Sequence, residues 1–209
     1  MTYPFVAARA VIAAAALALL ALAALHILKP EVDPRRNMIS QYALGRHGWV
    51  MALCFAAFAV ASACLVAALV AHVMSVLSWI GLVFLLVAAF GLAMAARFPM
   101  DPVSTPSVQW SFSGKMHGVA FLIGVPCQIF AVLLLSLGLR NQTFDVSLLL
   151  LLAAVIWLSL VIMIAIMLIV GPGKPKNPNG PDRFLGFANR LFMVGYGVWL
   201  MVVAWPMAR

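Results

Sequence analysis

The sequence predicts an all-α, polytopic membrane protein, six transmembrane helices in one bundle with long loops on one face. Two observations lead to this prediction. Only 9% of the 209 residues are charged and 66% are hydrophobic, whereas a soluble domain has about a quarter of its residues charged. The apolar residues form runs of about 20, enough for a helix to cross a hydrocarbon core of roughly 30 Å with its backbone hydrogen bonds satisfied. We expect one domain over residues 1–209, with spans at residues 5–28, 48–71, 73–96, 116–139, 146–170 and 184–207.

Each span has features of its own. The first resembles a signal peptide, because Arg9 precedes an Ala/Leu run, but that run continues well past the "ALA" at residues 21–23 and is expected to remain as a span. Small residues in the second span and Gly91 in the third predict close helix packing. Pro126 predicts a kink in the fourth. The fifth has no charge in its middle, and the sixth follows Pro181, a residue suited to a first helical turn.

The basic residues are divided unequally between the two membrane faces. With six spans, both termini lie on one face, here called face A, and the loops after the first, third and fifth spans lie on the other, face B. Most of the 13 Lys and Arg residues fall on face B, and the positive-inside rule therefore predicts that this face is cytoplasmic, although cations that bind a ligand would bias the same count. We expect a multi-pass protein of the bacterial plasma (inner) membrane.

The first long loop offers hydroxyl groups for a pocket. Pro30 and Pro34 oppose helix continuation, and the residues after them predict a short interfacial segment. In one interpretation Ser40 and Tyr42 line a pocket that His26 faces from the end of the first span. In the other, the aromatic and basic residues of this loop only anchor it among the headgroups.

Asp101 is the main candidate of the second loop. It lies where the third span leaves the membrane, so a partly desolvated carboxylate would need a cation or a metal ion as partner. The possible cationic partners are Lys115, His117, Arg190 and Arg97. The alternative is that Asp101 caps a turn at its Asp-Pro step.

His117 stands at the start of the fourth span, with Gly114 and Gly118 on the same helical stripe. Glycines at these positions leave room for a helix or a ligand to approach the imidazole. A histidine at the interface can equally be a hydrogen-bonded anchor. Both interpretations remain open from the sequence.

Arg190 is the informative residue of the third loop and the helix that follows. It lies two turns, about 10 Å, beyond Arg183 on the same helical face and precedes an unbroken apolar run. One interpretation is that it extends to the headgroups. The other is that it faces inward and either neutralises Asp101 or binds an anionic headgroup.

At these motifs the chain resembles the family of domain of unknown function 998, six-span integral membrane proteins. The resemblance rests on "SQYALGRHGW" at residues 40–49, "FPMDP" at 98–102, "GKMHG" at 114–118 and "NR" at 189–190, and it covers essentially the whole chain. Asn189 stands where the family often has glutamine. The resemblance implies no activity, but it implies a shared polar cluster formed by Ser40, Tyr42, Asp101, His117 and Arg190.

The first functional hypothesis is a membrane protein that binds an amphipathic lipid or isoprenoid headgroup on face B, with or without catalysis. Asp101, His117 and Ser40 are the catalytic candidates, with Asp101 as a general base or as the orienter of His117. If a zinc ion is present, its ligands would be His26, Asp101 and His117, but no two of these share a helix face as in usual zinc motifs. Haem is disfavoured because the histidines lie at helix ends. The expected ligand-binding residues are Arg190, Lys115, His117, Asp101, Tyr42, Ser40, His26 and Asn189.

Two further functions remain as alternatives. The small residues on several spans also suit a structural or accessory subunit of a larger membrane complex, and a small-solute transporter is the third hypothesis. A transporter would have ionisable groups or broken helices near the midplane, and the middles of the second, third and fifth spans carry no charge. The expected partner is a membrane lipid, or another membrane protein subunit under the accessory-subunit alternative, and no nucleic acid is expected.

Overall fold

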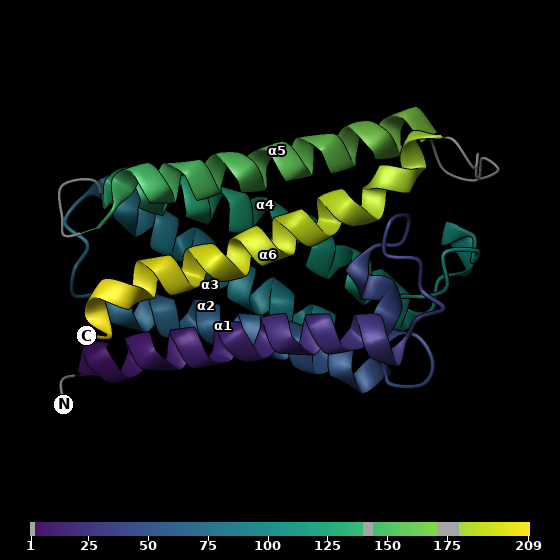
Figure 1. The fold of residues 1–209 in the computed structure, drawn as a ribbon, viewed down its shortest axis with the longest axis horizontal. Helices are drawn as coiled ribbons and strands as arrows, with labels where there is room; N and C mark the ends of the chain where they lie inside the picture. Colours follow the sequence, from purple (N-terminus) through teal and green to yellow (C-terminus); the bar gives the residue numbers. More distant parts are fainter. Residues whose placement is uncertain (1–2, 140–143, 171–179) are drawn as a thin grey trace.

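Six long helices form one bundle in the computed structural model, which describes residues 3–139, 144–170 and 180–209 (Figure 1). All six are long and apolar enough to cross a membrane, and the described residues contain no strand, so the all-α prediction is confirmed. The long helices are α1 (Tyr3–Leu28), α2 (Gly48–Leu69), α3 (Val76–Arg97), α4 (Phe112–Gly138), α5 (Val146–Val170) and α6 (Leu185–Ala204). The short 3-10 helices are η1 (Ile39–Ala43), η2 (Ser107–Gln109), η3 (Pro181–Phe184) and η4 (Trp205–Met207).

Serine side chains set the starts of two helices, and these starts differ from the expected ones. The Ser75 hydroxyl accepts from the Ser78 amide at 3.1 Å, so α3 begins at Val76 rather than at residue 73. The Ser111 hydroxyl accepts from the Gly114 amide at 3.0 Å, so α4 begins at Phe112, before the expected residue 116. An N-cap satisfies amides that the first turn leaves without an intrahelical partner. Hydropathy alone does not register these polar caps.

The helices pack as neighbours along the chain, with α6 closing the bundle. In sequence order, α1 packs on α2, α2 on α3, α3 on α4, α4 on α5 and α5 on α6, while α6 also packs on α1. Figure 1 shows α6 crossing diagonally between α1 and α5, with both chain ends at the same end of the bundle. The long segments between α1 and α2 and between α3 and α4 lie together at the opposite end, which is face B.

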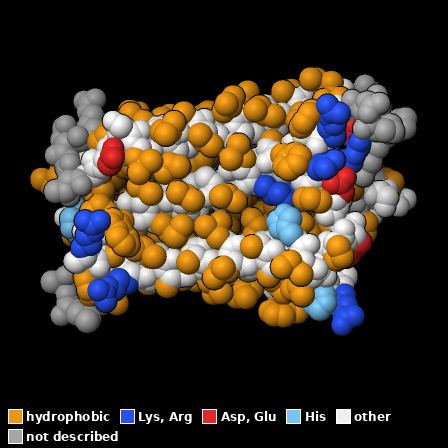
Figure 2. All heavy atoms as spheres, viewed as in Figure 1, with side chains coloured by type: hydrophobic (Ala, Val, Ile, Leu, Met, Phe, Trp, Pro, Cys, Tyr) orange, Lys and Arg blue, Asp and Glu red, His pale blue; other side chains and the backbone are white. Residues whose placement is uncertain are grey.

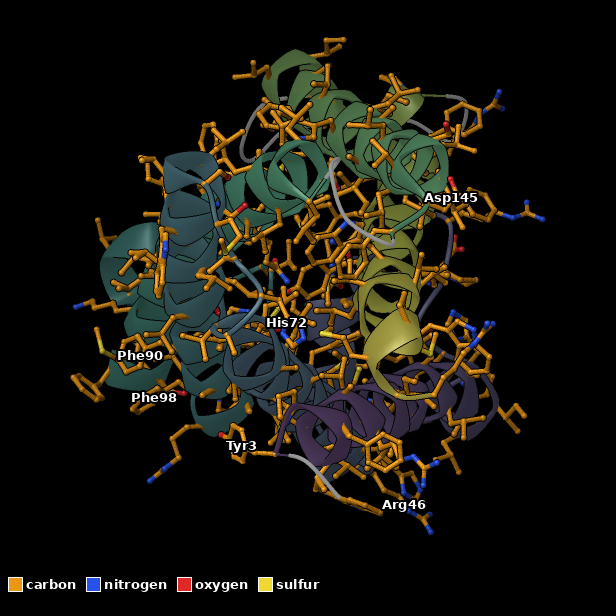
Figure 3. The ribbon with its side chains drawn as sticks, turned by 90° about the vertical axis from the view of Figure 1, so that its left-hand side faces the viewer. Tyr3, Arg46, His72, Phe90, Phe98 and Asp145 are labelled. Atoms are coloured by element: carbon orange, nitrogen blue, oxygen red, sulfur yellow. The ribbon has the colours of Figure 1, made fainter. Side chains whose placement is uncertain are left out.

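Hydrophobic side chains cover the middle of the molecule, and charged side chains gather towards its two ends (Figure 2). Viewed from face A, the helices surround a centre filled with side chains, and Phe90 points outward from the bundle (Figure 3). Aromatic residues fill much of the interior, since Trp199, Tyr196 and Phe58 are fully buried. A belt of exposed apolar side chains between polar ends is what a lipid bilayer requires of a protein surface.

Hydrogen bonds also join the helices. The Trp199 indole donates to the Ser136 hydroxyl at 2.9 Å, linking α6 to α4, and the Tyr196 and Ser62 hydroxyls lie 2.7 Å apart, linking α6 to α2. Such bonds contribute about 1 kcal/mol each between transmembrane helices. They fix the rotation of α6, which carries two of the predicted site residues.

Candidate functional site

Arg190 on α6 is held by neutral acceptors at the face B end of the bundle. Its Nε donates to Nε2 of His26 at 2.8 Å, and its NH2 group donates to the Tyr42 hydroxyl at 3.0 Å. Its NH1 group donates to the carbonyls of Asn37 at 2.7 Å and Gly186 at 3.0 Å. Guanidinium has five N–H donors, so these four bonds hold the group firmly and leave one donor. We call Arg190, His26 and Tyr42 the arginine cluster.

The hydrogen bonds of His26 define its tautomer. Its Nδ1 lies 2.8 Å from the Leu22 carbonyl, which only accepts. Its Nε2 faces Nε of Arg190, which only donates. The imidazole therefore carries its proton on Nδ1 and is neutral in this arrangement. All the positive charge of the arginine cluster rests on Arg190.

Three roles were open for Arg190, namely extension to the headgroups, neutralisation of Asp101 and binding of an anionic headgroup, and the second of these needs correction. None of the acceptors of Arg190 among the described residues is a carboxylate. Asp101 is bound elsewhere, accepting from the Ser111 amide at 2.7 Å and the Ser111 hydroxyl at 2.8 Å. The carboxylate thus lies at the N-terminus of α4, where hydrogen bonds and the helix dipole favour a negative charge. Neither interpretation from the sequence gives this contact, because Asp101 pairs with Ser111 at the start of α4 rather than with a cation or with a turn at its own Asp-Pro step.

The segment η1 is fastened from two sides, and this places Tyr42 against Arg190. The Asn189 side chain accepts from the Ile39 amide at 2.8 Å. Lys29, only 4% exposed, donates to the carbonyl of Tyr42 at 3.2 Å and to that of Leu44. Buried polar groups need such partners because leaving them unpaired is costly. Asn189 therefore positions the loop, in addition to its predicted place in the site.

A groove of about 460 Å³ runs between α1 and α6 and ends at the arginine cluster. Its walls are apolar, from Leu19, Leu22 and Ala23 on α1 and Val194 on α6, and its polar end is formed by His26 and Arg190. Figure 2 shows basic and histidine side chains beside the hydrophobic surface where these two helices meet. This groove opens on the surface that faces lipid.

His117 and Ser40 belong to a second, internal site. Together with Asn189 they line a cavity of about 60 Å³ inside the bundle. Nδ1 of His117 lies 2.9 Å from the Phe98 carbonyl, and the ring lies against Phe55 with centroids 6.3 Å apart. The expected single cluster is therefore divided, with Tyr42 and Arg190 on one side of η1 and Ser40 and His117 on the other.

Lys115 and the possible zinc ligands do not come together with the rest of the predicted site within the described residues. Lys115 is exposed and makes no ion pair within the described part of the chain. The possible zinc ligands His26, Asp101 and His117 have separate partners, and among residues 3–139, 144–170 and 180–209 no three His, Cys, Asp or Glu side chains come together as a metal site. The residues present do not fit the zinc hypothesis. Lys174 and Lys176, counted among the face B cations, lie outside the described residues.

The four sequence motifs all lie at the face B end of the bundle. The family described as "Protein of unknown function (DUF998)" matches residues 12–206.

The chain belongs to the DUF998 family.

Neither the comparison with curated proteins nor that with solved structures gave a match. Three of the sequence motifs have structural explanations here: "SQYALGRHGW" forms most of η1 and the start of α2, "FPMDP" holds the aspartate at the start of α4, and "GKMHG" lies in the first turns of α4. Gly114 in the last motif is required by space, because a Cβ there would lie 2.1 Å from Oδ2 of Asp101.

Sequence reasoning missed two polar residues of the site. Lys29 was counted only as one of the face B cations, yet it is buried and holds η1. Gln128 lies within the apolar run of α4, is 1% exposed and lines the internal cavity. A lone glutamine in a transmembrane run is itself a signal, because a buried polar group in lipid needs a partner.

Proposed function

We propose that this DUF998 protein binds an anionic membrane lipid in the groove between α1 and α6. The phosphate or carboxylate of the headgroup accepts from Arg190 at the arginine cluster, and an acyl chain lies along Leu19, Leu22 and Val194. The observation that carries the proposal is the position of Arg190, a cation with only neutral partners among the described residues, at the end of an apolar groove. Arg190 is partly buried, and an ionisable residue within a transmembrane bundle is costly and commonly marks a functional site.

The geometry of the arginine cluster suits recognition of an oxyanion. His26 and Tyr42 orient the guanidinium, so little side-chain freedom remains to be lost when the anion binds. Charge-assisted hydrogen bonds from arginine to phosphate or carboxylate are among the strongest available. The excess of cations on face B adds a long-range attraction for anionic lipid. If face B is cytoplasmic, as the charge distribution predicts, the lipid comes from the inner leaflet.

Native mass spectrometry of delipidated protein with added phosphatidylglycerol or phosphatidylcholine tests this proposal. Wild type is expected to retain phosphatidylglycerol in preference to phosphatidylcholine. Arg190→Gln is expected to lose that preference, and Arg183→Gln, at an exposed arginine of the same region, serves as the matched control.

A second variant tests the groove without touching the arginine cluster. Ala23 is exposed and lines the groove, so Ala23→Phe fills the groove while leaving the core packing intact. It is expected to weaken phosphatidylglycerol binding at least tenfold, whereas Ala93→Phe, at an exposed alanine of α3, leaves it unchanged. Equal retention by wild type, Arg190→Gln and Ala23→Phe would refute the proposal.

A further inference from the structure

The internal cavity lies between η1 and the helices α2 to α6, separate from the groove between α1 and α6. Its walls are mostly apolar, with Phe121, Met163, Phe192 and Met193 among them. None of the described residues that line it is Lys, Arg, Asp or Glu. An uncharged site of this kind favours a neutral ligand, since a buried ion without a counter-ion is strongly disfavoured.

Gln128 gives the cavity a donor, Nε2, that has no partner of hydrogen-bond geometry among the described residues. The side chain is 1% exposed, and no described residue accepts a hydrogen bond from its Nε2. The Tyr196 hydroxyl interacts with the Gln128 side chain and lies 2.7 Å from the Ser62 hydroxyl, but it does not meet hydrogen-bond geometry with Nε2. Buried amides in folded proteins nearly always have a partner, and an amide NH2 group has two N–H donors, so Nε2 remains able to donate to an acceptor from outside the protein.

The nature of that acceptor follows from the walls around it. A buried water molecule needs two to four polar partners, whereas most of the residues that line the cavity are apolar. A carbonyl oxygen needs only one donor, while the carbons attached to it suit the methionine and phenylalanine walls. The volume of about 60 Å³ admits a small group rather than a whole lipid.

We propose that this cavity binds an uncharged carbonyl group whose oxygen accepts a hydrogen bond from Nε2 of Gln128. The ligand is a small ketone-like molecule or the carbonyl-bearing end of a neutral lipid. His117 lies eleven residues, or about 16 Å along α4, from Gln128. His117 and Ser40 lie towards face B, so they mark the side from which the ligand enters. This site is independent of the arginine cluster and of the anionic lipid proposed above.

Infrared spectroscopy of ¹³C-carbonyl-labelled 2-pentanone with the purified, delipidated protein tests the proposal. A carbonyl that accepts a hydrogen bond absorbs at lower frequency than a free one, so wild type is expected to show a shifted, saturable band. Gln128→Met keeps the side-chain volume and removes the donor, and it is expected to lose that band. Gln109→Met, at an exposed loop position, keeps it. Gln128→Met should fold normally because the Nε2 group that it removes makes no bond of hydrogen-bond geometry within the described residues.

Native mass spectrometry of the same proteins purified without delipidation distinguishes the two sources of the carbonyl. A neutral lipid adduct present in wild type and Gln109→Met but absent from Gln128→Met would identify a lipid. A ketone band that depends on Gln128 without such an adduct would identify a small soluble carbonyl compound. If the band is absent or identical in wild type and Gln128→Met, and no adduct depends on Gln128, the proposal is wrong and the cavity holds water only.

Discussion

A methyl group added to Gly91 would collide with the backbone of α4. Its Cβ would lie 2.6 Å from the Gly124 Cα, 3.0 Å from the Gly124 amide nitrogen and 3.2 Å from the Ala120 carbonyl. The reverse change is much milder, because a Cβ on Gly124 would meet the Gly91 Cα at 3.4 Å. Two glycines at one helix crossing thus have unequal tolerance for alanine. The reason is that the Cα–Cβ vector of Gly91 points at the α4 backbone, which cannot rotate away as a side chain can.

The magnitude follows from two opposing contributions. Overpacking a tight contact costs about 1–3 kcal/mol, and replacing a helical glycine by alanine gains up to about 1 kcal/mol from backbone entropy. Gly91→Ala should therefore destabilise the protein by up to about 2 kcal/mol. Gly124→Ala meets no such collision and should be neutral or stabilising by up to about 1 kcal/mol.

Thermal unfolding of the two variants in the same mild detergent measures this difference. The expected order of melting temperatures is Gly124→Ala at or above wild type and Gly91→Ala below it. Gly45→Ala is a useful contrast, because Gly45 has open space around it but a φ of 70°, which penalises alanine through the backbone alone. If Gly91→Ala and Gly124→Ala melt at the same temperature, the inferred one-sided contact between α3 and α4 is wrong.

Three further predictions concern polar contacts. Lys29→Met leaves two backbone carbonyls of the first loop without their donor, so proteolysis within residues 29–47 should accelerate several-fold while the helices stay intact, and unchanged cleavage would count against the anchoring role of Lys29. Asp101→Ala should lower the free energy of unfolding by about 1–2 kcal/mol through loss of its bonds to Ser111. Asp101→Asn should lose only about half as much, because an amide retains one acceptor oxygen. Equal losses in the two variants would show that the charge alone matters. Trp199→Phe should lower the melting temperature by the equivalent of about 1 kcal/mol by removing the bond to Ser136, an effect that disappears in a Ser136→Ala background if the two groups interact as described.

The sequence alone predicts most of the fold because the membrane restricts the choices so strongly. An apolar run of about 20 residues has one stable form in lipid, the helix, and short turns make neighbours of consecutive spans. The first residues of α3 and α4 are not predicted by hydropathy, because the serines that cap these helices are common residues in any loop. The kink expected at Pro126 does not end α4, which continues as one helix from Phe112 to Gly138.

The site was predicted as a set of residues but not as an arrangement. Ser40, Tyr42, His117 and Arg190 all lie at face B, yet η1 divides them between a groove on the lipid-facing surface and a cavity inside the bundle. Residue spacing does not show this division, because it depends on which way a 3-10 helix turns each side chain. Asp101 was given a cationic partner on electrostatic grounds, but a nearby helix N-terminus satisfied its carboxylate first.

Composition and hydropathy by themselves determined the class of protein, the six helices and the gathering of polar residues at one end, because each follows from the cost of placing polar groups in lipid. Only the tertiary structure decided that Arg190 pairs with His26 and Tyr42, that Lys29 is buried, and that the Gln128 amide faces an uncharged cavity. Those outcomes depend on contacts between helices distant in the chain. Such contacts are set by the packing of whole surfaces, whereas a sequence motif records only its own neighbours.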